Sequence, residues 1–119
     1  MAVLAHAKWL RSIASSPEVH IRVGLSMGRA FNFAIFGDSK SARGSLQEAE
    51  DHATRAGHQI PKSEIRRVIV LAEIFMTEAI DARNAGDRTL ETDKVNAIND
   101  LMRRYDIGQP SRLAQFLQS

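Results

Sequence analysis

The stretch PKSEIRRVIVLAEIFMTEAIDARNAGD, residues 61–87, decides the fold. Proline near its start and glycine near its end are typical helix boundaries, so a long helix is expected from about Lys62 to Ala85. Its centre, Val68 to Met76, is apolar at every position except Glu73, so the helix is apolar nearly all round. Such a helix is either central in its own fold or shared with a partner chain, and we favour the first interpretation.

Similar boundary signals predict helices on both sides of this one. Ser16-Pro17-Glu18 opens a helix that runs to about Phe36, and a second is expected from about Ser39 to Ala56. Ser45 and Glu48 match a capping box inside the second segment, which could begin there instead. Further helices are expected from about Val3 to Ala14, from Asp87, Thr89 or Thr92 to about Tyr105, and in a last segment that carries Leu113, Phe116 and Leu117.

The repeat of a glycine-aspartate pair indicates how these helices are connected. Gly37-Asp38 and Gly86-Asp87 each combine a helix stop with a helix cap, which is typical of a tight helical hairpin. No stretch alternates with the period of two that a strand requires. The sequence therefore predicts an all-α single domain over residues 1–119, a small helical bundle of four to six helices arranged as two hairpins plus terminal helices.

Composition excludes several classes of protein. The chain has 119 residues, of which 44% are hydrophobic and 25% charged, and its formal net charge is +2. It has no cysteine, so disulfides and cysteine-ligated metals are excluded. No strictly apolar run is longer than that from Val68 to Ala72, which is far shorter than the roughly 20 residues of a bilayer span. No secretory leader is recognisable at the start, and a cytoplasmic location is expected by default.

Three short motifs suggest chemistry, but none has its usual context. Gly24-Leu25-Ser26-Met27-Gly28 matches a nucleophile elbow without the strand that must precede it. Gly37-Asp38-Ser39-Lys40-Ser41 lacks the second glycine of a phosphate loop. Glu48 and His52 could supply two metal ligands, but no matching Glu-x-x-His pair exists elsewhere. We therefore expect no catalytic residues, no metal and no cofactor.

The glycines of the first motif have a steric interpretation. Gly24 and Gly28 are four residues apart, so they leave a bare strip on one helix face that a neighbouring helix can approach closely. Each glycine costs about 1 kcal/mol relative to alanine inside a helix, which suggests a compensating contact. Both are predicted to be helix-packing residues.

Two functions remain open. The first is a non-catalytic interaction protein, an adaptor, regulator or small subunit, that binds a protein partner or a second copy of itself. The apolar helix would supply the surface, through Val68, Leu71, Ile74 and Phe75. The alternative is nucleic-acid binding through Arg103, Arg104 and Arg112, which flank a glycine-containing turn between two helices.

Overall fold

The computed structural model describes residues 17–119 and contains helices only within that range. They are α2 (Pro17–Ile35), α3 (Ser39–Arg55), α4 (Ile65–Asn84), α5 (Arg88–Tyr105) and α6 (Leu113–Gln118). The all-α class and the two hairpins, α2–α3 and α4–α5, are confirmed. The helix expected from Val3 to Ala14 lies outside the described residues.

Both hairpin turns use the predicted glycine-aspartate pair in the same way. Gly37 and Gly86 have positive φ angles of 90° and 76°, a conformation that glycine adopts without strain. The amide of the following aspartate donates back to a carbonyl in the last turn of the helix, Phe33 in one hairpin and Ala82 in the other. Each aspartate side chain then caps the next helix by accepting a 3.0 Å hydrogen bond from a backbone amide.

The expected start of α3 at Ser39 is confirmed, but two other expectations about helix starts differ from the structure. Ser45 is not a cap, because α3 already begins at Ser39 under the Asp38 cap and Ser45 is buried within the helix. The helix α4 begins at Ile65, and its cap is Glu64, whose carboxylate accepts from the amide of Arg66. Helix α5 ends at Tyr105, as expected, and the connection after it turns at Asp106, the only non-glycine residue with a positive φ among residues 17–119.

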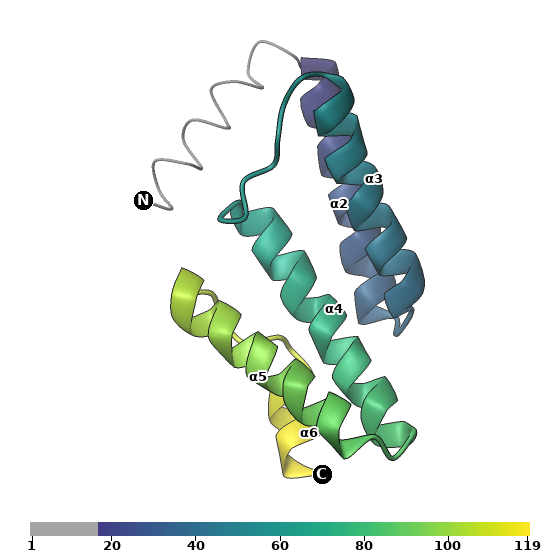
Figure 1. The fold of residues 1–119 in the computed structure, drawn as a ribbon, viewed down its shortest axis with the longest axis vertical. Helices are drawn as coiled ribbons and strands as arrows, with labels where there is room; N and C mark the ends of the chain where they lie inside the picture. Colours follow the sequence, from purple (N-terminus) through teal and green to yellow (C-terminus); the bar gives the residue numbers. More distant parts are fainter. Residues whose placement is uncertain (1–16) are drawn as a thin grey trace.

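Helix α4 lies at the centre of the molecule (Figure 1). It packs on α2 and α3 on one side and on α5 on the other. The core is divided into two clusters along its length, and α4 contributes Val70 and Ile74 to the first and Met76 and Ala79 to the second. The first cluster lies between the α2–α3 hairpin and α4, and the second includes Ile98 of α5 and Leu113 and Phe116 of α6.

This arrangement accounts for the apolar character of α4 on nearly all sides. Successive turns face different neighbours, so buried positions occur around most of the helix. The buried side chains are Val68, Val70, Ala72, Glu73, Ile74, Met76, Thr77, Ala79 and Ala82.

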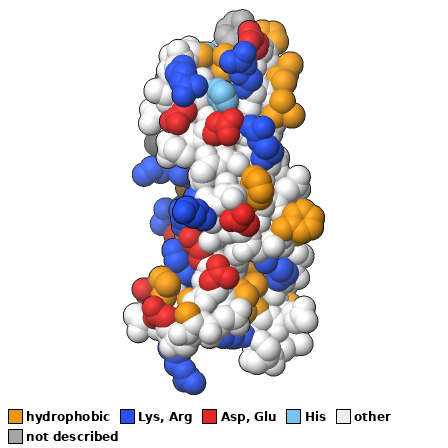
Figure 2. Space-filling model, turned by 90° about the vertical axis from the view of Figure 1, so that its right-hand side faces the viewer, with side chains coloured by type: hydrophobic (Ala, Val, Ile, Leu, Met, Phe, Trp, Pro, Cys, Tyr) orange, Lys and Arg blue, Asp and Glu red, His pale blue; other side chains and the backbone are white. Residues whose placement is uncertain are grey.

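The surface is mixed in charge. On the face that lies on the side of α3, acidic and basic side chains are interspersed and apolar side chains are scattered (Figure 2). Within residues 17–119, no helix combines the length and hydropathy that crossing a bilayer requires.

Candidate interaction groove

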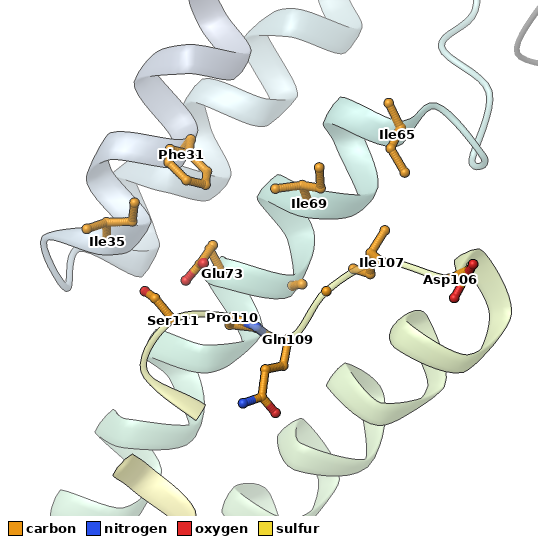
Figure 3. A pocket seen from close by; sticks show the side chains of 12 residues that line it. Phe31, Ile35, Ile65, Ile69, Glu73, Asp106, Ile107, Gln109, Pro110 and Ser111 are labelled. Atoms are coloured by element: carbon orange, nitrogen blue, oxygen red, sulfur yellow. The ribbon is translucent and has the colours of Figure 1, made fainter. Parts of the chain in front are cut away.

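A groove of about 540 Å³ lies between α2, α4 and the connection from α5 to α6, and we call it the lower groove. Helix α2 contributes Phe31 and Ile35, which are four residues apart and therefore share a face. Helix α4 contributes Ile65 and Ile69 with the same spacing, and Ile107 of the connection lies on the far side (Figure 3). The rest of the lining comes from Ala72, Glu73, Asp106, Gly108, Gln109, Pro110 and Ser111.

The lining of the lower groove is mainly apolar and includes a few polar groups. Ile65 and Ile69 are each 40% exposed, although they lie on the helix that contributes to both core clusters. The polar lining groups are Glu73, Asp106, Gln109 and Ser111, and Glu73 lies between the apolar side chains of α2 and those of α4 (Figure 3). A mainly apolar lining with a few polar groups is typical of binding sites.

A second, smaller hollow of about 250 Å³ adjoins the first, and we call it the upper groove. The two share Phe31 and Ile69. The upper groove lies between α2 and the start of α4, and its remaining lining residues are Gly24, Met27, Gly28, Arg66 and Val70.

Next to the lower groove, Arg112 holds the connection against α2 and α4. Its guanidinium donates to the carbonyl oxygen of Ala34 at 3.1 Å and to the hydroxyl of Thr77 at 2.9 Å. It also lies 3.4 Å from a carboxylate oxygen of Glu73. The Thr77 hydroxyl itself donates to Ala34. These bonds satisfy buried polar groups where the two hairpins meet.

A charged cluster joins α3, α4 and α5 around Glu78. Arg43 of α3 donates two hydrogen bonds of 2.7 Å to the Glu78 carboxylate, and Lys94 of α5 lies 3.1 Å from it. Both cations also lie over the ring of Phe75. Burial of the carboxylate opposes ionisation, but the hydrogen bonds from Arg43 and Lys94 outweigh it, so the pKa of Glu78 is lowered. The hydrogen bond with Glu78 in turn raises the pKa of Arg43.

The predicted partner-binding residues divide into two groups. Val68 and Ile74 are both 0% exposed, so neither can contact a partner in this conformation. Leu71 and Phe75 are half-buried, Leu71 against the first core cluster and Phe75 against the second. The most exposed large apolar side chains of α4 are instead those of Ile65 and Ile69, which were not among the predicted partner-binding residues.

No described helix packs closely on the predicted glycine strip. A side chain built at Gly28 would meet nothing within 4 Å, and at Gly24 it would meet only the Arg66 guanidinium, at 3.6 Å. The strip instead forms one wall of the upper groove.

The three arginines of the nucleic-acid alternative do not form one surface. Arg103 and Arg104 are exposed at the end of α5 and both pair with Asp100. Arg112 is engaged within the fold, as described above.

The short motifs also have structural roles. Ser26 of the apparent nucleophile elbow is fully buried in the middle of α2. His52 lies 3.4 Å from Glu48, but residues 17–119 contain no group of three or more histidine and carboxylate side chains that could hold a metal ion.

The signal that could have identified the lower groove is the position of Ile65 and Ile69. They form an i, i+4 apolar pair in the first turns of α4, on the same helix face that the buried residues Ala72 and Met76 continue further along. The sequence gives no such signal for Ile107 and Pro110. Their position opposite Ile65 and Ile69 depends on how the segment between α5 and α6 folds back across α4.

Comparisons with known proteins give no family for this chain. No protein-family model matches the sequence, and neither a curated protein nor a solved structure is significantly similar to it.

Proposed function

We propose that this protein is a non-catalytic interaction protein, and that the lower groove binds an apolar segment of a protein partner. The observation that carries the proposal is the exposed pair Ile65 and Ile69 in the wall of a preformed groove. A helix that presents apolar side chains three and four residues apart would match this pair and the opposing pair, Phe31 and Ile35.

The lining favours a binding site over a catalytic one. Its side chains are mainly aliphatic and aromatic. Glu73, the carboxylate that borders the groove on α4, is paired with Arg112 and contributes to the fold. Burying apolar area contributes about 25 cal/mol per Å², so covering this surface supplies a driving force for association.

The first experiment compares two substitutions that are matched in position and exposure. Ile65 and Leu90 both lie in the first turn of a helix, and each is 40% exposed. Aspartate is favourable near a helix N-terminus, so Ile65→Asp and Leu90→Asp should both fold. We expect Ile65→Asp to weaken partner binding at least about tenfold, or 1.4 kcal/mol, and Leu90→Asp to leave it unchanged.

The second experiment identifies the partner by contact. A photo-reactive residue at Gln109 borders the lower groove, whereas the same residue at Gln118 lies on α6 and outside it. In nuclease-treated extract of the native cell, the Gln109 probe should cross-link a protein that the Gln118 probe does not. Equal labelling by both probes, or a captured species that nuclease removes, would contradict the proposal, and the second result would favour the nucleic-acid alternative.

A further inference from the structure

The charged residues that line the lower groove are both acidic. They are Glu73 of α4 and Asp106 at the end of α5. None of the described residues in the lining is a lysine, an arginine or a histidine. The chain as a whole has a formal net charge of +2. The lining of the groove therefore has the opposite sign of charge to the whole protein.

Glu73 is buried, but its carboxylate has a weak share of hydrogen-bond donors. Its side chain is 8% exposed, and its ion-pair partner within residues 17–119 is Arg112, at 3.4 Å. The contacts of Arg112 to Ala34, Thr77 and Glu73 all come from one nitrogen atom, Nη2, which carries two hydrogen atoms. The shorter contacts, 2.9 Å to Thr77 and 3.1 Å to Ala34, use these hydrogens. The longer contact leaves the carboxylate of Glu73 able to accept a further donor.

A carboxylate in this position restricts what can cover the groove. Glu73 lies between the apolar side chains of α2 and those of α4 (Figure 3). A partner that covers the lower groove removes water from this carboxylate, and burying a charge without a partner is costly. A wholly apolar segment would leave the charge unpaired, and an acidic segment would repel it. The segment that binds must therefore bring a cation or another strong donor to Glu73.

Asp106 adds negative charge at another part of the lining. It is exposed and lies at the C-terminal end of α5, where the helix dipole is also negative. The two arginines in the last turn of α5 pair with Asp100, so Asp106 has no ion-pair partner among residues 17–119. In Figure 3, Asp106 and Glu73 lie on opposite sides of Ile107. A second cation is therefore favoured at a distance from the first, with apolar contacts between them.

We infer that the segment bound in the lower groove is a basic amphipathic helix. Its apolar side chains contact Ile65 and Ile69, and lysine or arginine side chains beside them pair with Glu73 and Asp106. Long basic side chains suit this arrangement, because their methylene groups cover apolar surface while the charged end reaches a carboxylate. The inference rests on the proposed function, because it names the chemistry of the partner at the same groove.

Three synthetic helical peptides test the inference with the full chain. They share the same leucines, spaced three and four residues apart, and differ only at the positions that flank the leucines, which are lysine, glutamine or glutamate. We expect the lysine peptide to bind about tenfold more tightly than the glutamine peptide, and the glutamate peptide to bind most weakly, as measured by isothermal titration calorimetry. General attraction to the protein would give the opposite order, because the net charge of the chain is positive.

The glutamine peptide separates this inference from the proposed function. Its binding depends on apolar contacts, so Ile65→Asp should weaken it and Leu90→Asp should not. Equal affinities of the three peptides, or tightest binding of the glutamate peptide, would overturn the inference and leave the proposed function in place. If none of the peptides binds, the proposed function is contradicted, and the inference with it.

Matched charge variants locate the contacts. Asp106→Asn and Asp93→Asn each remove one negative charge from an exposed position, but only Asp106 lines the groove. Asparagine tolerates the left-handed conformation that Asp106 adopts, so the turn should be kept. We expect Asp106→Asn to reduce the preference for the lysine peptide over the glutamine peptide about twofold, and Asp93→Asn to leave it unchanged.

Glu73→Gln should reduce this preference further, by about fivefold, because the carboxylate is buried. The comparison of two peptides removes any effect of the variant on the fold. Damage to the groove would weaken the lysine and glutamine peptides equally, whereas loss of the charge weakens only the lysine peptide. A preference that stays at its wild-type value in both Glu73→Gln and Asp106→Asn would overturn the inference.

Discussion

Arg112 shows how one residue can have a role that local sequence does not reveal. Its position beside a short helix suggested contact with phosphate, but its guanidinium binds the carbonyl of Ala34, 78 residues earlier in the chain. No local pattern encodes that partner, because it becomes a neighbour only when the two hairpins pack together. Asp38 and Asp87 are the opposite case, since their partners lie three residues away and both caps could be predicted.

Removing the Arg112 side chain should destabilise the fold. We expect Arg112→Ala to lower the free energy of unfolding by about 2–3 kcal/mol, because it leaves buried groups of Ala34, Glu73 and Thr77 with fewer partners. Urea denaturation followed by circular dichroism measures the change. Arg104→Ala, which removes an exposed ion pair with Asp100, should change stability by less than about 0.5 kcal/mol. Equal effects of the two variants would mean that Arg112 does not hold the hairpins together.

Glycines within the chain should respond to alanine in opposite directions. Gly86→Ala should cost about 1 kcal/mol or more, because the φ of 76° at this turn is unfavourable for a residue with a side chain. Gly44→Ala should add up to about 1 kcal/mol, because Gly44 lies inside α3 with open space around it. Thermal unfolding of both variants tests the pair, and a stabilising Gly86→Ala would contradict the observed turn.

At the scale of elements, helix limits were easier to predict than helix neighbours. The limits of α2 and α4 follow from proline, glycine and capping residues close to each end. It was harder to predict which faces of α4 are buried. Nearly every position in the centre of this helix is apolar, so the sequence pattern does not indicate which side faces the core. Only the packing of α2 and α5 on opposite sides shows that Ile74 is inside and Ile69 is at the surface.

The Glu78 cluster should make the packing of α3, α4 and α5 sensitive to acid. The pKa of Glu78 is lowered from its ordinary value of 4.5, so the ionised carboxylate favours the folded chain. This stabilisation is present above the pKa of the unfolded chain and is lost as the pH falls through the lower, folded-state pKa. The free energy of unfolding should therefore decrease between neutral pH and about pH 3 by more in the wild type than in Glu78→Gln.

A control separates this cluster from the helix caps. The pKa of Asp38 is also lowered, by the hydrogen bonds from Ser41, and Glu78→Gln leaves that contribution in place. The variant should thus keep part of the acid sensitivity. Identical pH profiles of stability for the wild type and Glu78→Gln would show that the ion pairs with Arg43 and Lys94 do not contribute.

At the scale of the whole molecule, the two core clusters are joined by a continuous helix. Ile74 belongs to the first cluster and Met76 to the second, yet they are two residues apart on α4. Unfolding one cluster removes the support of the helix that the other requires. The described part of the protein is therefore expected to unfold as one unit.

Matched core substitutions test this cooperativity. Ile74→Ala and Met76→Ala each remove a side chain that is 0% exposed, so each should cost about 2–5 kcal/mol. Both should shift a single transition, with circular dichroism and Tyr105 fluorescence changing together. Two separate transitions in either variant, one for each hairpin, would show that α4 does not couple the clusters.

The bond between Arg112 and Ala34 also has a consequence for the order in which the chain folds during synthesis. The α2–α3 hairpin contains its own turn and part of the first core cluster, so it can form before α5 is translated. The carbonyl oxygen of Ala34 can then accept a hydrogen bond from Thr77 once α4 has packed on the hairpin. It can accept the hydrogen bond from Arg112 only after residue 112 has left the ribosome. Limited proteolysis of chains stalled before and after this point should show the junction between the hairpins becoming resistant to cleavage last.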